Sequence, residues 1–157
     1  MKILLVEDDS FKALSISDYI HEECKQAIIT IASSLVDAID SVNNENFDLI
    51  LVDMGIPSHP TVAGGGSPMS LLTGGLDVLL ELNSLGRADP CLIITQYPEI
   101  EISGNFYPVN CATEKILIHL SCVVMDCILY IEGSSEWKGA LKKALNTVTG
   151  NYENLNT

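Results

Sequence analysis

The sequence predicts an α/β fold: a doubly wound, five-stranded parallel sheet with helices on both faces. Short apolar runs, typical of strands buried on both faces, alternate along the chain with segments whose apolar residues recur at helical spacing. The chain has 157 residues and 47% of them are hydrophobic, so a single domain can enclose a sizeable core. We expect this domain to span residues 1–150 and residues 151–157 to form a frayed tail.

A strand, a helix and a second strand are predicted first. Residues 3–6 form a continuous apolar run, as expected of a buried strand. Ser10 is a suitable N-cap for a helix over about residues 11–25. Residues 27–31 are rich in β-branched side chains and are predicted to form the second strand. The apolar face of the helix consists of Ala13, Ile16, Ile20 and Cys24.

A second helix, a third strand and a long loop follow. Ser33 or Ser34 caps the helix, and residues 47–52 form the next apolar run. Residues 57–73 contain prolines and the run Gly64-Gly65-Gly66, so we expect a loop there. The glycines match no phosphate-binding pattern. The buried stripe of the second helix consists of Leu35, Ile39 and Val42.

The remaining elements repeat the alternation of helix and strand. A third helix over residues 76–85 is opened by Gly75 and ended by Gly86, and a fourth over about residues 112–123 follows a loop at 96–110. The fourth strand covers residues 91–94 and ends in Thr95, and the fifth covers 127–131. A last helix begins after residues 133–135 and buries Trp137, Leu141 and Leu145.

Acidic side chains follow two of these strands. Glu7 and Asp8 come directly after the first strand, and Asp53 comes directly after the third. If the strands are neighbours, the carboxylates meet at the edge of the sheet where ligands bind in such folds, and Thr95 ends a strand at the same edge. Carboxylates at close range raise each other's pKa or recruit a cation, and oxygen ligands suit Mg²⁺. Such a site can draw a phosphoryl group onto Asp53.

Composition narrows the partners and the compartment. The net charge of −13 argues against direct binding of nucleic acid and favours a basic protein surface. The five cysteines are odd in number and lack CxxC spacing, which indicates reduced thiols and a cytoplasmic protein. The N-terminus does not resemble a signal peptide, and the longest apolar stretch, residues 116–131, is interrupted by His119 and Asp126, so no membrane association is expected.

Over residues 2–149 the chain resembles the receiver domains of bacterial two-component response regulators, the CheY-like fold. The matching segments are residues 2–9 (KILLVEDD), 53–57 (DMGIP) and 93–95 (IIT). The resemblance implies a flavodoxin-like sheet with strand order 2-1-3-4-5.

The resemblance also implies a role for each matching polar residue. Asp53 would be the phosphoacceptor, and Asp8 would bind Mg²⁺ directly. Glu7 would hold the ion through water, and Gly55 would offer its backbone carbonyl. Thr95 would donate its hydroxyl to a phosphoryl oxygen. A divalent cation is needed because the carboxylate nucleophile and the phosphoryl group are both negative.

One departure from the family concerns a lysine at the end of the fifth strand. Its place is taken by Tyr130 or, in a second alignment, by Gly133. The lysines nearest in sequence are Lys115 and Lys138, on flanking helices. A charge-assisted hydrogen bond contributes about 1.5–3 kcal/mol, so its loss should weaken phosphoryl stabilisation while Mg²⁺ binding could survive.

The leading hypothesis is a stand-alone receiver rather than an enzyme. It would take a phosphoryl group onto Asp53 from a sensor histidine kinase or a phosphotransfer protein and signal by binding a downstream protein. The alternative is a pseudo-receiver that binds its partner without phosphorylation, as suggested by the absent lysine and by insertions at residues 58–73 and 96–110. A third possibility, a Mg²⁺-dependent phosphatase, lacks the second Asp of the haloacid-dehalogenase pattern, because Gly55 stands there.

Overall fold

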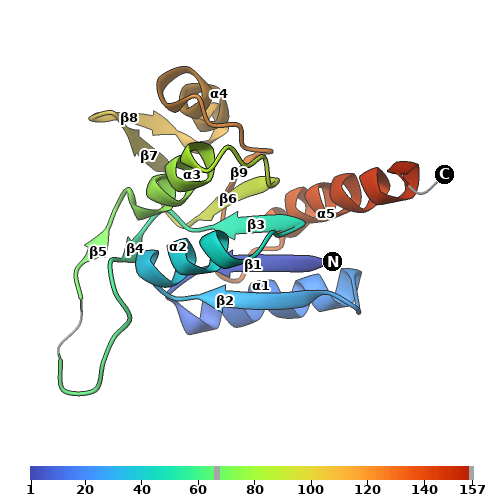
Figure 1. Cartoon of the computed structure of the whole chain (residues 1–157), viewed down its shortest axis with the longest axis horizontal. Coiled ribbons are helices and arrows are strands. Elements are labelled where there is room, and N and C mark those ends of the chain that lie inside the picture. Colours follow the sequence, from blue (N-terminus) through green and yellow to red (C-terminus); the bar gives the residue numbers. More distant parts are fainter. Residues whose placement is uncertain (66–67, 156–157) are drawn as a thin grey trace.

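The computed structural model describes residues 1–65 and 68–155 and contains a five-stranded parallel sheet (Figure 1). The strand order is β2-β1-β3-β6-β9, and every neighbouring pair is parallel. This is the order 2-1-3-4-5 of the five expected strands, so the predicted fold class is confirmed. Residues 66–67 of the predicted loop and residues 156–157 of the predicted tail lie outside the described residues. The sheet strands are β1 (Lys2–Val6), β2 (Ile28–Ala32), β3 (Leu49–Val52), β6 (Cys91–Thr95) and β9 (Cys127–Leu129).

Helices cover both faces of the sheet because successive strand residues point to opposite faces. Ile3 and Leu5 of β1 belong to one buried cluster, together with residues of α1 and α5. Leu4 and Val6 belong to a second cluster, with residues of α2, α3 and α4. The fold is therefore doubly wound, as expected. The helices are α1 (Ser10–Glu23), α2 (Leu35–Asn44), α3 (Gly74–Ser84), α4 (Val109–Leu120) and α5 (Glu136–Leu155).

The caps of the first two helices refine the sequence interpretation. Asp9, not Ser10, caps α1: its carboxylate accepts the backbone N–H groups of Phe11 and Lys12, at 2.9 Å and 3.1 Å. Aspartate is as good a cap as serine. Because the cap is Asp9, Ser10 becomes the first residue of the helix. For α2, Ser34 is the cap, because its hydroxyl accepts the N–H of Asp37 at 3.2 Å.

The segment predicted as a loop at residues 96–110 contains a β-hairpin, so that prediction is wrong. Strands β7 (Glu99–Ile102) and β8 (Asn105–Pro108) pair in antiparallel fashion. The turn between them consists of Ser103 and Gly104, whose φ angles are 51° and 79°. Two positive φ angles give a turn whose twist matches that of the strands. Ile100 and Ile102 point into the core on the α4 side, which anchors the hairpin.

Two other segments are more regular than predicted. At the base of the loop expected over residues 57–73, β4 (Ile56–Pro57) pairs with β5 (Ser70–Leu71). At the C-terminus, α5 extends past Gly150 to Leu155, so part of the expected tail is helical. Within the described ranges, no helix has the length and apolar character needed to cross a bilayer.

An ion pair connects the loops at the amino-terminal edge of the sheet. The carboxylate of Asp89 accepts the backbone N–H of Phe47 and the Nε–H of Arg87, each at 2.9 Å. Arg87 also donates to the carbonyl of Val42, at the end of α2. These contacts hold the loop before β6 against the loop before β3, at the opposite edge from the acidic residues.

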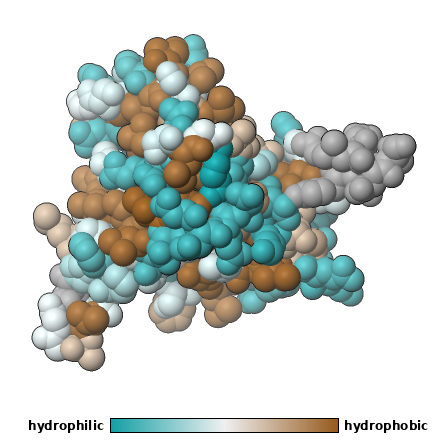
Figure 2. Space-filling model, in the orientation of Figure 1, coloured by the Kyte–Doolittle hydropathy of each residue, from teal (hydrophilic) through white to brown (hydrophobic). Residues whose placement is uncertain are grey.

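The surface has polar and apolar regions. Hydrophilic residues gather over the middle of the face shown in Figure 2, in the region of α2. Hydrophobic residues are more frequent at the top, where Figure 1 shows α4 and the β7–β8 hairpin. Phe106, Leu117 and Ile118 of these elements are each more than half exposed, at 61%, 51% and 60%.

Candidate functional site

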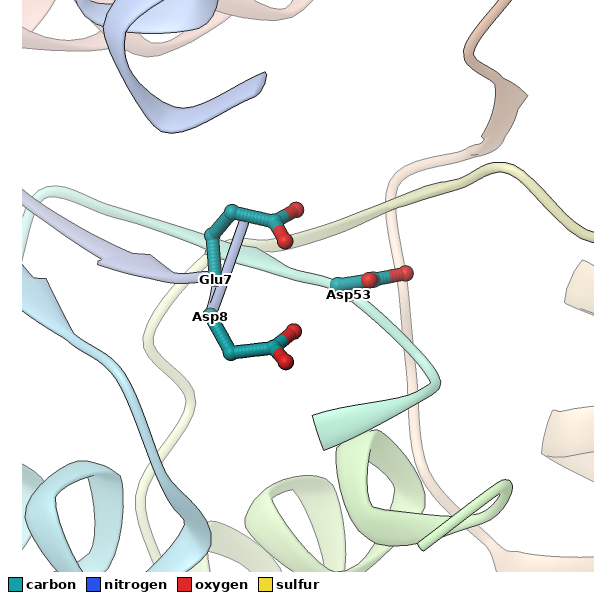
Figure 3. A group of neighbouring side chains, drawn as sticks. All are labelled: Glu7, Asp8 and Asp53. Atoms are coloured by element: carbon teal, nitrogen blue, oxygen red, sulfur yellow. The ribbon is translucent and has the colours of Figure 1, made fainter. Parts of the chain in front are cut away.

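Three carboxylates converge at the carboxyl edge of the sheet. β1 pairs with β3 in a register that places Val6 opposite Val52, so the residues that follow these two strands are neighbours. Figure 3 shows Glu7 and Asp8 extending from the end of β1 toward Asp53 at the end of β3. One carboxylate oxygen from each lies within 4.8 Å of the others. The structure thus brings together these three of the predicted site residues.

The three carboxylates differ in burial. Glu7 and Asp53 are 2% and 7% exposed, whereas Asp8 lies on the exposed side of the cluster. Burial raises the pKa of Glu7 to about 7, and the charge of Asp53 adds to this effect, while Lys12 opposes it. Partial desolvation likewise raises the pKa of Asp8. Concentrated negative charge with little solvent is the condition under which carboxylates recruit a cation.

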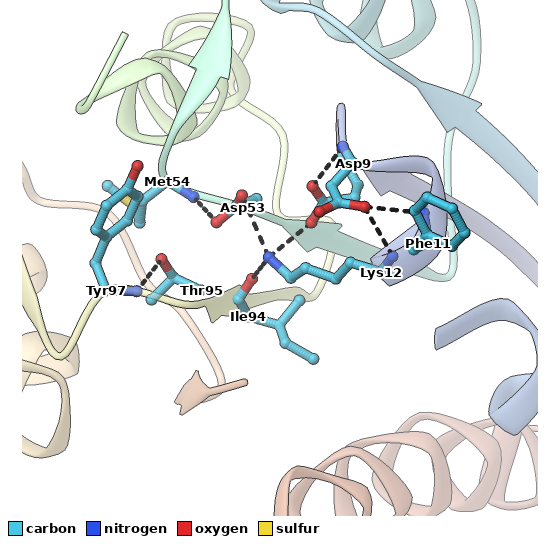
Figure 4. A network of polar contacts seen from close by, with 9 residues as sticks. Asp9, Phe11, Lys12, Asp53, Met54, Ile94, Thr95 and Tyr97 are labelled. Atoms are coloured by element: carbon cyan, nitrogen blue, oxygen red, sulfur yellow. Dashed lines mark hydrogen bonds and ion pairs between the residues drawn. The ribbon is translucent and has the colours of Figure 1, made fainter. Parts of the chain in front are cut away.

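A lysine that the sequence analysis did not single out lies inside this cluster. The Nζ atom of Lys12 is 2.7 Å from Oε2 of Glu7 and 3.2 Å from Oδ2 of Asp53. It also donates to the carbonyl oxygen of Ile94 at 3.0 Å. Figure 4 shows the side chain reaching from α1 toward Asp53 and Ile94. Only 2% of Lys12 is exposed, so the ammonium is a buried cation between two buried carboxylates.

Aromatic side chains close the cluster on the β9 side. The ring of Tyr130 has its centroid 5.6 Å from Nζ of Lys12 and 5.1 Å from the ring of Trp137. Both aromatic residues are buried and belong to the core between the sheet and α1 and α5. The ring of Tyr130 therefore occupies the space at the carboxyl end of β9. Of the two lysines nearest in sequence, Lys115 lies over the ring of Tyr107.

The other candidate, Lys138, lies 5.1 Å from the ring centroid of Tyr19 and 5.7 Å from that of Trp137. Both lysines contact aromatic rings, and neither forms an ion pair with the three carboxylates. The positive charge at the cluster comes from α1 instead.

Two further predicted site residues border the cluster. Thr95 ends β6 and is fully buried, and its hydroxyl oxygen accepts the backbone N–H of Tyr97 at 3.2 Å. Gly55 lies against the same tyrosine, since a Cβ at Gly55 would stand 2.8 Å from its ring. Between them, the N–H of Met54 donates to Oδ1 of Asp53 at 2.7 Å and fixes its carboxylate (Figure 4).

The oxygen atoms of the cluster fit a small divalent cation. Mg²⁺ binds oxygen at about 2.1 Å, so ligands on opposite sides of the ion are about 4.2 Å apart. The three carboxylate oxygens lie within 4.8 Å of one another, a separation close to that of ligands around one such ion. The donor set consists only of oxygen atoms, which suits a hard cation.

The chain is similar in sequence to a protein of stated role. It is 38% identical to the Detocs response regulatory protein DtcB of Vibrio alginolyticus over 109 residues, which are 68% of this chain and 73% of that protein. A scan against protein-family models finds no match.

Solved structures with the same fold are CheY-like receiver domains. The N-terminal domain of a response regulator/sensory box/GGDEF protein from Carboxydothermus hydrogenoformans superposes with a TM-score of 0.64 at 20% identity, with all of both chains covered. The receiver domain of the sensor histidine kinase PA1611 from Pseudomonas aeruginosa has a TM-score of 0.58 at 18% identity, and the match covers 95% of this chain and 97% of that one. That receiver domain holds a magnesium ion coordinated in its active-site cleft.

Proposed function

This chain belongs to the response regulators with a CheY-like receiver domain, and from that premise we propose that Asp53 accepts a phosphoryl group in a magnesium-dependent reaction. One observation carries the proposal: carboxylates from β1 and β3 meet a buried ammonium group at the carboxyl edge of the sheet. A nucleophilic carboxylate beside further carboxylates needs such cationic surroundings, because its substrate is also an anion.

The residues divide the work of phosphoryl transfer. Asp8 and Asp53 would hold Mg²⁺ directly, Glu7 through water and Gly55 through its backbone carbonyl. When bound, the ion neutralises charge that develops on the transferring phosphoryl oxygens. The N–H of Met54 orients the Asp53 carboxylate, with an N–O distance of 2.7 Å. An oxygen of Asp53 forms the new bond to phosphorus as the bond from phosphorus to the donor breaks, and the electrons of that bond leave with a histidine ring nitrogen or, for acetyl phosphate, with the acetate oxygen.

After transfer, the site must accommodate a group with about 1.5 to 2 negative charges. The buried hydroxyl of Thr95 accepts a hydrogen bond from the backbone of Tyr97 and still has its own proton to donate. We propose that the hydroxyl donates this hydrogen bond to a phosphoryl oxygen. A shift of Thr95 toward Asp53 would pull on the segment that begins at Tyr97 and leads into the β7–β8 hairpin, which links modification to a change at the surface.

The partners follow from this chemistry. The phosphoryl donor would be a sensor histidine kinase or a phosphotransfer protein, and a downstream protein would read the modified state. The protein would act as a signalling module and not as a multiple-turnover enzyme, through one domain over residues 1–150. The five cysteines are free thiols, which favours a reducing compartment such as the cytoplasm.

The direct test is phosphorylation by a small donor. The protein is incubated with acetyl phosphate and Mg²⁺, and the intact mass and the modified peptide are measured. We expect the mass of one phosphoryl group on Asp53, no gain in Asp53→Asn, and a normal gain in Asp40→Asn, which removes an exposed carboxylate on α2. A chelator should abolish the gain. Wild-type protein that stays unmodified, or a gain that persists in Asp53→Asn, would contradict the proposal.

A second candidate function, the pseudo-receiver, is favoured by a single contact. The ion pair between Lys12 and Asp53 already neutralises part of the cluster without a metal. A domain locked in this state could bind its partner with no phosphorylation. In that case Asp53→Asn would bind the downstream protein as tightly as wild type does, whereas the leading proposal expects the binding to depend on modification.

A further inference from the structure

All three N–H groups of the Lys12 ammonium have an acceptor within reach. These are Oε2 of Glu7 at 2.7 Å, Oδ2 of Asp53 at 3.2 Å and the carbonyl of Ile94 at 3.0 Å. An ammonium group has three donors and no acceptor, and here three protein oxygen atoms lie within 3.2 Å of it. Burying a lysine costs free energy unless it is paired in this way. Its position is therefore specified by the site and is not a by-product of surface packing.

The loop between β1 and α1 holds Lys12 in place. The backbone N–H of Asp9 donates to Oε1 of Glu7 at 3.0 Å, and the Asp9 carboxylate in turn caps the helix at Lys12 with an N–O distance of 3.1 Å. The Lys12 ammonium then returns to the other oxygen of Glu7. The short segment that supplies two of the carboxylates thus also supplies and orients the cation.

We propose that Lys12 of α1 binds the phosphoryl group on Asp53, in place of the lysine that the end of β9 lacks. This inference rests on the proposed function. When an Asp53 oxygen bonds to phosphorus, acetate leaves acetyl phosphate with the bonding electrons and carries away one negative charge. The Asp53 carboxylate loses its own charge, and the negative charge at this position then lies on the phosphoryl oxygens. The N–H that pairs with Oδ2 of Asp53 turns to a phosphoryl oxygen. The bonds to Glu7 and Ile94 remain, and no proton is transferred.

The metal and the lysine would approach Asp53 from different sides. Asp8, the exposed member of the cluster, forms no ion pair with Lys12, whose side chain is 1% exposed and pairs with the buried Glu7 and Asp53. The ion would therefore bind toward Asp8 and solvent, and the ammonium would stay behind Glu7 and Asp53. Two cations that share the same carboxylates also repel each other. The lysine should thus weaken Mg²⁺ binding while it strengthens phosphoryl binding.

This opposition gives a test that a structural role cannot mimic. In Lys12→Met, a replacement of similar length without charge, we expect beryllofluoride, a phosphoryl mimic, to bind about 10- to 100-fold more weakly in saturating Mg²⁺, because a charge-assisted hydrogen bond is lost. Mg²⁺ alone should bind severalfold more tightly. The fluorescence of Trp137, the one tryptophan of the chain, reports both titrations because its ring packs on Tyr130 beside Lys12.

Two further variants keep the test decisive. Lys138→Met removes a lysine that contacts aromatic rings and not the carboxylates, so both affinities should stay at wild-type values. If Lys12→Met does not fold, the double variant Glu7→Gln/Lys12→Met removes both buried charges together, a change that is often tolerated. It should still bind Mg²⁺ but lose beryllofluoride affinity by the same factor.

The outcomes distinguish failure of the proposed role of Lys12 from failure of the proposed function. Unchanged beryllofluoride affinity in Lys12→Met or in the double variant, with wild type fully active, would overturn the role of Lys12 and leave the proposed function intact. A parallel loss of Mg²⁺ and beryllofluoride binding in both would show a structural role and would also overturn it. Wild-type protein that takes neither beryllofluoride nor a phosphoryl group would overturn the proposed function together with the inference.

Discussion

Replacing Glu7 with glutamine isolates the electrostatic cost of the acidic cluster. Burial raises the pKa of Glu7 from its ordinary 4.5 to about 7, against the opposing effect of Lys12. A carboxyl group whose pKa is higher in the folded than in the unfolded state holds extra protons in the folded state between these two values. The stability of the fold therefore decreases as the pH rises through this window, from about 4.5 to about 7.

The size of the effect follows from the shift. Each pKa unit corresponds to about 1.36 kcal/mol, so a shift from 4.5 to about 7 amounts to about 3 kcal/mol. Glutamine keeps the shape of the side chain but does not titrate. The free energy of unfolding of Glu7→Gln, minus that of wild type, should thus increase by about 3 kcal/mol between acidic pH and pH 8. Titrations of groups common to both proteins cancel in this difference.

The measurement is urea-induced unfolding in the presence of a chelator, at pH steps from the acidic to the alkaline side of neutrality. Far-ultraviolet circular dichroism and Trp137 fluorescence follow the transition, and the slope m is compared between proteins. Glu45→Gln is the matched control, because Glu45 forms an exposed ion pair with Lys2. A difference between Glu7→Gln and wild type that does not change with pH would refute the reasoning. So would a difference that shrinks as the pH rises.

Three other substitutions probe the packing beside the site and the ion pair at the opposite edge of the sheet. Gly75→Ala should destabilise the fold by about 1–3 kcal/mol and impair beryllofluoride binding, because its Cβ would lie 2.3 Å from the backbone oxygen of Asp53. Gly55→Ala should cost less in thermal unfolding, because the three atoms nearest to its Cβ all belong to Tyr97, a side chain that is 41% exposed and can rotate. An equal loss in both variants would contradict this contrast. Asp89→Ala should cost about 3 kcal/mol or more in urea unfolding at pH 7, because it leaves its guanidinium partner unpaired in a mostly buried site. Burial pushes the pKa of Asp89 up, but hydrogen bonds from the Arg87 guanidinium and the Phe47 N–H bring it below its ordinary value of 3.8. The stabilisation by this ion pair should therefore persist at neutral pH and disappear as the pH falls below about 4. A variant that differs from wild type equally at pH 3 and pH 7 would contradict this.

The sheet strands could be predicted because they carry local signals. Residues buried on both faces must be apolar without interruption, and the runs that contain Leu4, Ile50 and Ile93 meet that condition. The edge strand β2 is largely exposed, and its signal is its β-branched residues. The hairpin at residues 99–108 was missed because Pro98, Gly104 and Pro108 outweighed a weaker signal. That signal was the alternation of Ile100 and Ile102 with glutamates, followed by Ser-Gly at the turn.

In the site, the carboxylates could be predicted and the lysine could not be placed without the fold. Glu7 and Asp53 follow apolar runs directly, so a parallel sheet brings them together. Lys12 stands four residues before Ile16 and eight before Ile20, on the same stripe of α1, and that spacing was the available signal. A charged residue on a buried stripe is usually exposed at its tip. Only the arrangement of β1, β3 and β6 supplies the acceptors that keep its ammonium buried.

Charge accounting explains why modification of this site should act as a switch. Three carboxylates and one ammonium leave a net charge of about −2 when Glu7 is ionised, which one Mg²⁺ ion balances. Phosphorylation replaces the single charge of Asp53 by about −1.5 to −2, so the balanced cluster gains up to one uncompensated negative charge. Lys12 already pairs with Asp53, so its turn to a phosphoryl oxygen replaces that ion pair and adds no positive charge to the site. The remaining charge has to be met by groups that move, and the hydroxyl of Thr95, at the end of a neighbouring strand, is the donor whose movement also displaces Tyr97 and the hairpin beyond it.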